Sequence, residues 1–180
     1  MIMKRTSLLI FLLLLTLRVT FSQVPERLEK LDFFIGEWEL STSDLQPDGS
    51  FAAGKASSMV YYILDGQAIQ DDFRGLDKLG NIVFRGTSIR SYSSDQSLYI
   101  ISWLMPGRKG LTDLRAEWKD GKLVGKGEGY DGYGSFKERF EYSNISDSTY
   151  TFRMDRSYDG GETWLKDFNR IEATKKEPNN

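Results

Sequence analysis

The side chains that could do chemistry in this chain are carboxylates, tyrosines, lysines and arginines, because the 180-residue sequence contains neither histidine nor cysteine. Absence of histidine excludes Ser–His–Asp hydrolysis, an imidazole base, histidine-ligated zinc and histidine-bound heme. Absence of cysteine excludes thiol catalysis, thiolate metal sites and disulfides. The sequence therefore predicts no metal and no cofactor.

Two adjacent carboxylates stand in the run QDDFRG. Asp71 and Asp72 alternate along a strand and so point to opposite faces, whereas the two acids of a glycosidase face each other at roughly 5–10 Å. We interpret both as solvated or ion-paired acids. A pairing of Asp71 with Glu138 or Glu128 across a barrel interior stays open.

The stretch RSYDGGETW fits the pattern S-x-D-x-G-x-T-W, the Asp-box found on hairpins of sialidases and other carbohydrate-active proteins. In those proteins the motif is repeated, lies outside the catalytic site and stabilises a turn through side-chain hydrogen bonds. Here it occurs once, which favours a structural turn over a carbohydrate contact. Its members are Ser157, Asp159, Gly161, Thr163 and Trp164.

The N-terminus has the features of a secretory signal. Lys4 and Arg5 precede an apolar run over residues 8–17, which is too short for a permanent membrane anchor of about 20 residues. We expect cleavage after about Ser22 and export to the periplasm or the medium, with a retained N-terminal anchor as the alternative. The expected parts are a signal peptide (1–22), one barrel domain (23–175) and a polar tail (176–180).

The charge of the expected mature chain is mildly acidic. Three of the 24 basic residues and none of the 26 acidic residues lie in the signal, which leaves 21 basic against 26 acidic groups, or −5. Nucleic-acid binding requires clustered cations, so the composition argues against it.

The remaining sequence consists of short alternating or aromatic-rich runs separated by turn residues. Asp–Gly turns favour antiparallel hairpins, and nothing after a short N-terminal helix beginning near Pro25 repeats at a helical period. We therefore predict an all-β fold, an up-and-down barrel of about ten strands. The expected strands are 37–45, 55–64, 67–75, 82–92, 97–104, 111–119, 122–130, 133–143, 148–158 and 163–175.

Two of these strands carry charge on an otherwise apolar face. Glu138 lies among Phe136, Phe140 and Tyr142, and Arg156 shares a face with Tyr150. An unpaired charge is costly in a dry core, so these faces favour a wet or ligand-filled barrel interior over a sealed one with internal ion pairs. The residues expected to line it are Arg90, Tyr92, Trp103, Glu138, Tyr150 and Arg156.

The run LDFFIGEWEL predicts a closed barrel end. Gly36 allows close backbone approach, Trp38 enters the first strand, and Arg170 in the last strand is expected to stack on the Trp38 ring. The glycine-dense run GKGEGYDGYG lacks the strand-to-helix context of a phosphate loop, and we expect it to make room inside the barrel beside an open mouth.

The motifs LDFFIGEWEL, ILDGQAIQDDFRG and SYDGGETW, in this order, resemble a bacterial domain family of unknown function with lipocalin-like barrels. The layout is similar to that of calycins in general, including fatty-acid-binding proteins and nitrobindin-like barrels. The resemblance extends from about Leu31 to Ile171. It implies the barrel fold and leaves the activity open. Nitrobindin-like barrels bind heme through a histidine that this chain lacks.

The resulting hypothesis is an exported barrel that binds a small, partly apolar ligand, whose acidic group would meet Arg90 or Arg156. Two alternatives remain. One is an accessory protein for extracellular polysaccharide, with Tyr99, Trp118 or Trp164 as exposed stacking platforms. The other is a barrel lyase or isomerase that uses tyrosine and carboxylates. Whether the protein is an enzyme and how it oligomerises stay open.

Overall fold

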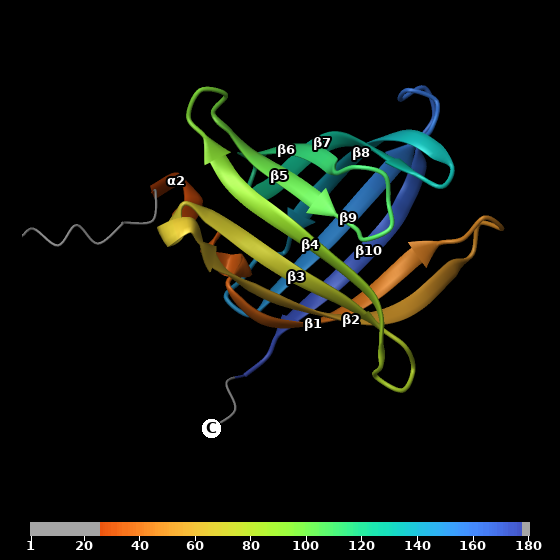
Figure 1. Cartoon of the computed structure of the whole chain (residues 1–180), viewed down its shortest axis with the longest axis horizontal. Coiled ribbons are helices and arrows are strands. Elements are labelled where there is room, and N and C mark those ends of the chain that lie inside the picture. The colour runs from red at the N-terminus through yellow and green to blue at the C-terminus, as the bar shows by residue number, and fades with distance from the viewer. Residues whose placement is uncertain (1–25, 178–180) are drawn as a thin grey trace, which may run out of the picture.

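The protein is a closed barrel of ten antiparallel strands in the computed structural model, which describes residues 26–177 (Figure 1). Each strand pairs with its neighbours in the sequence, and β1 pairs with β10 to close the wall. The predicted all-β barrel is therefore confirmed. The strands are β1 (Gly36–Leu45), β2 (Phe51–Ile63), β3 (Ala68–Leu76), β4 (Ile82–Ser93), β5 (Leu98–Leu104), β6 (Thr112–Lys119), β7 (Lys122–Asp131), β8 (Gly134–Ser143), β9 (Thr149–Ser157) and β10 (Leu165–Lys175).

Tight turns join these strands, as the Asp–Gly pairs predict. Between β6 and β7, Asp120 and Gly121 both have positive φ angles of 50° and 75°, which is the backbone of a two-residue hairpin turn that matches strand twist. The largest difference from the expected strand bounds is at β2, which begins four residues early, at Phe51 rather than at 55. Residues 51–54 pair with Leu45 to Thr42 of β1, so long-range pairing extends a segment that lacks polar–apolar alternation.

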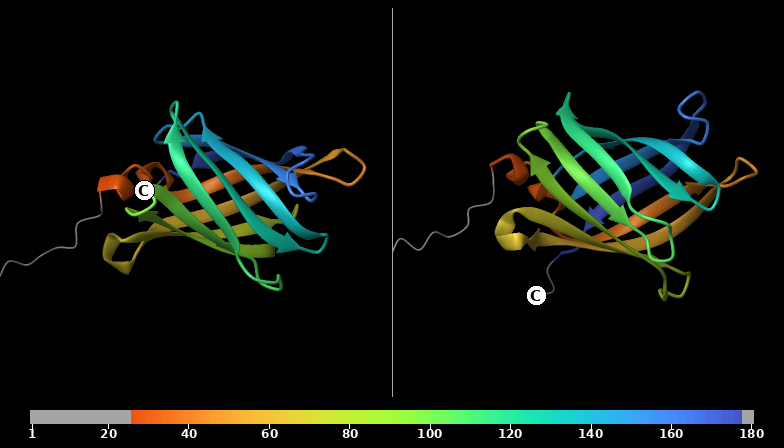
Figure 2. Two further views of the ribbon diagram at one scale, coloured as in Figure 1. Left: turned by 90° about the horizontal axis from the view of Figure 1, so that it is seen from above. Right: turned by 45° about the horizontal axis from the view of Figure 1, so that its top comes forward.

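Two short helices cover one end of the barrel: α2 (Glu26–Glu29) and the 3-10 helix η1 (Asp32–Phe34) (Figures 1 and 2). Leu28 and Phe34 of these helices, together with Leu31 between them, are buried with Trp38 of β1. The Trp38 indole donates a hydrogen bond of 2.7 Å to the Phe34 carbonyl, and the Tyr99 hydroxyl donates one of 2.7 Å to the Arg27 carbonyl. This end is therefore closed by packing and by hydrogen bonds to the wall.

The expected stacking of Arg170 on Trp38 is wrong. Pairing of β1 with β10 places Lys175 opposite Trp38 and Arg170 opposite Ser43, five residues away. The Lys175 ammonium lies 5.4 Å from the Trp38 ring centroid, and the Arg170 guanidinium lies 5.0 Å from that of Phe51. The cation–π contact between the last and first strands at the closed end is therefore made by Lys175 with Trp38.

The expected signal peptide at 1–22 and Pro25 lie outside the described residues, as does most of the expected tail. The helix that the structure does describe begins at Glu26. Within residues 26–177, no helix is both long and apolar enough to cross a membrane.

A cavity inside the barrel as the candidate functional site

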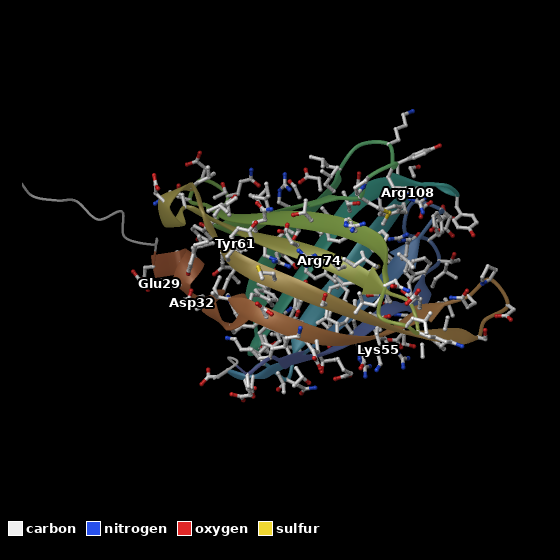
Figure 3. All side chains as sticks on the ribbon, turned by 60° about the horizontal axis from the view of Figure 1, so that its bottom comes forward. Glu29, Asp32, Lys55, Tyr61, Arg74 and Arg108 are labelled. Atoms are coloured by element: carbon white, nitrogen blue, oxygen red, sulfur yellow. The ribbon has the colours of Figure 1, made fainter. Side chains whose placement is uncertain are left out.

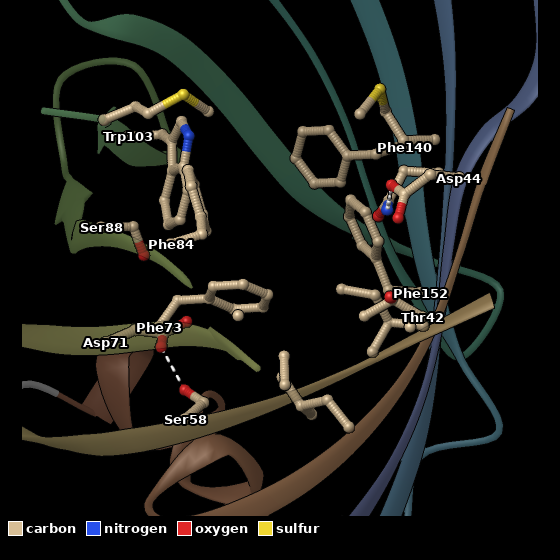
Figure 4. A pocket seen from close by; sticks show the side chains of 18 of the residues that line it. Thr42, Asp44, Ser58, Asp71, Phe73, Phe84, Ser88, Trp103, Phe140 and Phe152 are labelled. Atoms are coloured by element: carbon tan, nitrogen blue, oxygen red, sulfur yellow. Dashed lines mark hydrogen bonds between the residues drawn. The ribbon is translucent and has the colours of Figure 1, made fainter. Parts of the chain in front are cut away.

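The barrel encloses a cavity of about 550 Å³ between the helix-covered end and the opposite, open end (Figure 4). Phe73, Phe84 and Trp103 form one wall, with ring centroids 5.9–6.5 Å apart. Phe140 and Phe152, 6.0 Å apart, lie on the opposite side. These aromatic side chains come from β3, β4, β5, β8 and β9, so the cavity is built by strands from most of the barrel.

Inward-facing glycines leave space for aromatic side chains of the neighbouring strands. A β-carbon on Gly86 of β4 would collide with the Trp103 indole, and one on Gly125 of β7 would collide with the Phe140 ring. Each ring therefore lies directly on the backbone of the neighbouring strand. Apart from β7, every strand contributes residues to the cavity lining. The glycine-dense run makes room for aromatic rings rather than binding a ligand itself.

The deep end of the cavity contains a buried ion pair. Arg90 of β4 donates a hydrogen bond of 2.8 Å from Nη2 to Asp71 Oδ2, and the two side chains are 5% and 12% exposed. Ser58 of β2 donates to the other Asp71 oxygen (Figure 4). The Arg90 guanidinium also lies 4.5 Å from the Phe34 ring centroid, so it connects the cavity floor to the helices that close the barrel.

Burial controls the protonation of this deep cluster. Burial alone would lower the pKa of Arg90, but the Asp71 carboxylate, with smaller contributions from Tyr142 and Tyr150, raises it, so Arg90 keeps its charge. Burial raises the pKa of Tyr142, partly offset by Arg90, and raises that of Tyr150 well above its ordinary value. Both phenols remain protonated at neutral pH. The Nε and Nη1 atoms of Arg90 and Oγ of Ser88 are buried without a hydrogen-bond partner among the described residues.

A second ion cluster lies toward the open end. Arg156 of β9 pairs with Glu138, its cross-strand neighbour on β8, and its Nη1 donates a hydrogen bond of 2.8 Å to Asp131 Oδ2. The guanidinium is held between the rings of Phe136 and Phe168, at 3.9 and 4.3 Å from their centroids. The two aromatic rings therefore pack on the Arg156 guanidinium, and the two carboxylates bind its nitrogen atoms.

Glu138 of this cluster has a raised carboxyl pKa. Burial raises the pKa of its carboxyl, while the Arg156 guanidinium opposes that shift and nearby Asp131 adds to it. Burial alone would lower the pKa of Arg156, but Glu138 raises it, so the arginine stays charged. The pair remains compensated over the neutral pH range.

Charge is balanced over the whole cavity lining. The lining cations Arg90, Arg156 and Lys55 match the lining anions Asp71, Glu138 and Asp44, and Asp131 adds a further carboxylate to Arg156 from just outside. An acidic ligand would bring an uncompensated negative charge beside these carboxylates. The expectation that Arg90 or Arg156 receives an acidic group therefore does not fit, because both arginines are already paired.

Five of the six residues expected to line the interior do so: Arg90, Trp103, Glu138, Tyr150 and Arg156. Tyr92 does not line the cavity. Its ring packs 5.3 Å from that of Tyr99 and lies 6.0 Å from the Arg27 guanidinium, at the end covered by α2. It shares the inward face with Arg90 but lies one pleat further along β4, beyond the cavity floor.

Sequence reasoning missed most of the aromatic wall and the ion pair of Arg90 with Asp71. Asp71 faces the interior and Asp72 the outside, where Gln70, Tyr61 and Thr87 donate hydrogen bonds to it. The opposite orientation of the two acids is as predicted, although Asp71 pairs with Arg90 rather than with Glu138 or Glu128. Inward alternation on the hairpin of β3 and β4, which places Asp71 opposite Ser88, is the signal that would have identified this pair.

The Asp-box residues form a hairpin turn between β9 and β10. Asp159 accepts hydrogen bonds from the Ser157 hydroxyl and the Thr163 amide at 2.7 and 2.9 Å, and the Gly161 amide donates to Ser157 Oγ at 2.8 Å. Bonds from Thr163 and Ser157 hold the pKa of Asp159 well below its ordinary value. The Trp164 ring packs under the Arg139 guanidinium at 4.4 Å. None of these residues lines the cavity.

No protein-family model matches the chain, and no curated protein matches it in sequence. Solved structures match it in fold. One is Rv2717c from M. tuberculosis, with a TM-score of 0.61, 6% identity, and coverage of 86% of this chain and 100% of that one. Another is the S-type phycobiliprotein lyase CPES from Guillardia theta, with a TM-score of 0.57, 11% identity, and coverage of 84% and 93%. The chain thus shares a calycin-like barrel fold with these two proteins.

Proposed function

We propose that this protein is an exported barrel that binds a small, partly apolar ligand without net charge in its central cavity. The observation that carries the proposal is a 550 Å³ cavity with aromatic walls and compensated buried charges. This volume lies within the range of pockets for drug-sized molecules. Export rests on the N-terminal sequence pattern. Membership of the lipocalin-like family that the motifs resemble is part of the same proposal.

The deep end favours a ligand that carries an oxygen acceptor. Ser88 Oγ is buried without a partner, and Arg90 has two buried donor atoms beside the Tyr142 phenol, whose pKa burial raises and the guanidinium lowers, whereas both Asp71 carboxylate oxygens already accept hydrogen bonds. An unpaired buried donor is costly, so an acceptor that reaches it is strongly favoured. The ligand class that fits is therefore a neutral molecule with an aromatic or polyene body and a carbonyl or hydroxyl oxygen at one end.

Two alternatives receive less support. A polysaccharide role rested on exposed aromatic platforms, but Tyr99 is only 3% exposed and Trp164 packs under Arg139. A barrel lyase would need a proton-transfer group, and one structural neighbour is named a lyase. Here the Tyr150 phenol stays protonated and Glu138 is held by Arg156, so the available groups are better suited to binding than to proton transfer.

Filling the cavity is expected to weaken binding of a neutral apolar probe. Ala56 on β2 is buried and lines the cavity, whereas Ala53 on the same strand faces solvent. Ala56→Phe should weaken binding of N-phenyl-1-naphthylamine, followed by its fluorescence, by about tenfold or more, because the added ring occupies the probe's space. Ala53→Phe, the same change on the outer face, should bind like the parent.

Folding must be separated from blocking in this experiment. Thermal unfolding of both alanine variants controls for overpacking, which is destabilising in a packed interior. Met105→Trp, at the open end of the lining, supplies a second blocking variant that leaves the buried wall intact. Unchanged probe binding in both blocking variants would show that the cavity is not the binding site.

A further inference from the structure

Large exposed apolar side chains gather around the open end of the barrel. Among the described residues, nine of the twelve exposed large apolar side chains lie in or beside the loops of that end. The helix-covered end has Leu64. Soluble proteins rarely gather exposed apolar side chains in one place without a partner for them.

Three neighbouring hairpins, β3–β4, β5–β6 and β7–β8, carry the most exposed of these residues. Leu79 is 87% exposed, Tyr133 80%, Val83 67% and Leu111 55%. Val83 also lines the cavity, so the apolar rim continues into the apolar interior. We call these three hairpins the apolar rim.

The same hairpins carry unpaired cations. Lys78, Arg108 and Lys109 are exposed, and none forms an ion pair with another described residue. Figure 3 places Arg108 at the end of the barrel opposite Glu29 and Asp32 of the helical end. The acids near these loops already have partners: Asp77 accepts hydrogen bonds from Asn81 and the Leu79 amide, and Asp131 from Arg156. The exposed Asp113 and Glu128 pair with Arg115 and Lys137.

We propose that the apolar rim docks on the surface of a lipid bilayer containing anionic lipids, with the open end of the barrel facing the membrane. Apolar loop tips beside cations fit the boundary between headgroups and acyl chains, where phosphates meet the cations and hydrocarbon meets the tips. Docking here would let an apolar ligand pass between bilayer and cavity without crossing water. That last step rests on the proposed function; docking itself does not.

The rim favours a bilayer over a protein partner for two reasons. Its apolar side chains project from separate loop tips around the barrel opening instead of forming one packed patch. Such separate tips can each insert into a deformable bilayer, whereas a protein interface requires a continuous complementary surface. Arg108 donates a hydrogen bond to Met105 Sδ and Lys109 lies 5.4 Å from the Tyr130 ring centroid, so neither charge is neutralised by a carboxylate, although the whole chain carries a net charge of −2.

The absence of native cysteine makes a position-specific test possible. Leu79→Cys and Tyr133→Cys place an environment-sensitive nitrobenzoxadiazole label on the rim, and Leu64→Cys places it at the helical end, where Leu64 is 69% exposed. With vesicles of phosphatidylcholine and phosphatidylglycerol in a 3:1 ratio, the rim labels should shift to the blue and brighten, whereas the Leu64 label should not. Because each label reports its own position, contact through residues 1–25 would not shift the rim labels.

Substitution tests the residues themselves. The triple change Leu79→Ser, Leu111→Ser, Tyr133→Ser should weaken vesicle binding about tenfold or more, and Leu64→Ser should not. Lys109→Glu or pure phosphatidylcholine vesicles should weaken it further. Rim labels that stay unchanged with every vesicle, or that shift with protein concentration alone, as self-association would produce, would overturn the proposal. Binding of N-phenyl-1-naphthylamine in vesicle-free solution is unaffected by either outcome and so reports on the proposed function separately.

Discussion

Arg90→Met is expected to lower the free energy of unfolding by about 3–5 kcal/mol, because it leaves the Asp71 carboxylate buried without its cation. It also removes the guanidinium that packs on Phe34 of the closed end. For a domain of this size, such a loss corresponds to a melting temperature lower by roughly 10 °C. Urea unfolding followed by circular dichroism measures it.

Two further variants separate charge burial from general damage. Arg85→Met changes an exposed arginine on the same strand, which forms no ion pair among residues 26–177, and should change stability by less than about 0.5 kcal/mol. Arg90→Met/Asp71→Leu removes the whole pair and should recover most of the loss, since apolar replacements of buried pairs are often neutral. Equal losses in Arg85→Met and Arg90→Met would contradict the assigned role of the pair.

Arg156→Met is expected to cost a similar amount, about 3–5 kcal/mol at neutral pH, and to make stability depend on pH. The Glu138 side chain is 8% exposed and has Asp131 as a neighbour, so the loss of Arg156 removes the influence that holds its raised pKa down. A carboxyl whose folded-state pKa lies above the unfolded-state value of about 4.3 is protonated in both states at pH values below about 4.3, so it costs no folding stability there. The penalty grows as pH rises through the folded-state pKa.

The variant should therefore regain stability relative to the parent as the pH falls from 7 to 5. Arg156→Met/Glu138→Gln lacks the Glu138 titration and should show a smaller loss and a weaker pH dependence than Arg156→Met, the remainder coming from Asp131, which also loses its partner Arg156. Arg153→Met, an exposed arginine on the same strand, serves as the matched control. A parallel pH dependence of the parent and Arg156→Met would show that Glu138 does not carry an unpaired charge in the variant.

The strands were predictable because their signals are local. Alternation in FKERFEYS identifies the inward face that carries Glu138 and Phe140, and Asp–Gly pairs identify the turns. Glu138 and Arg156 were expected inside, and their contact follows once β8 and β9 are paired in register.

Long-range register was not predictable in the same way. The partner of Trp38 depends on how β10 closes against β1, across the whole length of the chain, and a shift of five residues exchanges Arg170 for Lys175. Tyr92 shows the same limit along one strand. Polar–apolar alternation predicts that Tyr92 faces the barrel interior. It does not predict how far along β4 the cavity extends before α2 and the Tyr99 ring close it.

The central claim is that a charge-compensated cavity binds a neutral, partly apolar molecule. Its most direct test is a parallel fluorescence titration with two probes that share a ring skeleton, neutral N-phenyl-1-naphthylamine and anionic 1-anilinonaphthalene-8-sulfonate. We predict that the neutral probe binds about tenfold or more tightly than the anion and quenches the fluorescence of Trp103, which lines the cavity. Equal or tighter binding of the anion, with Ala56→Phe blocking it, would contradict the account.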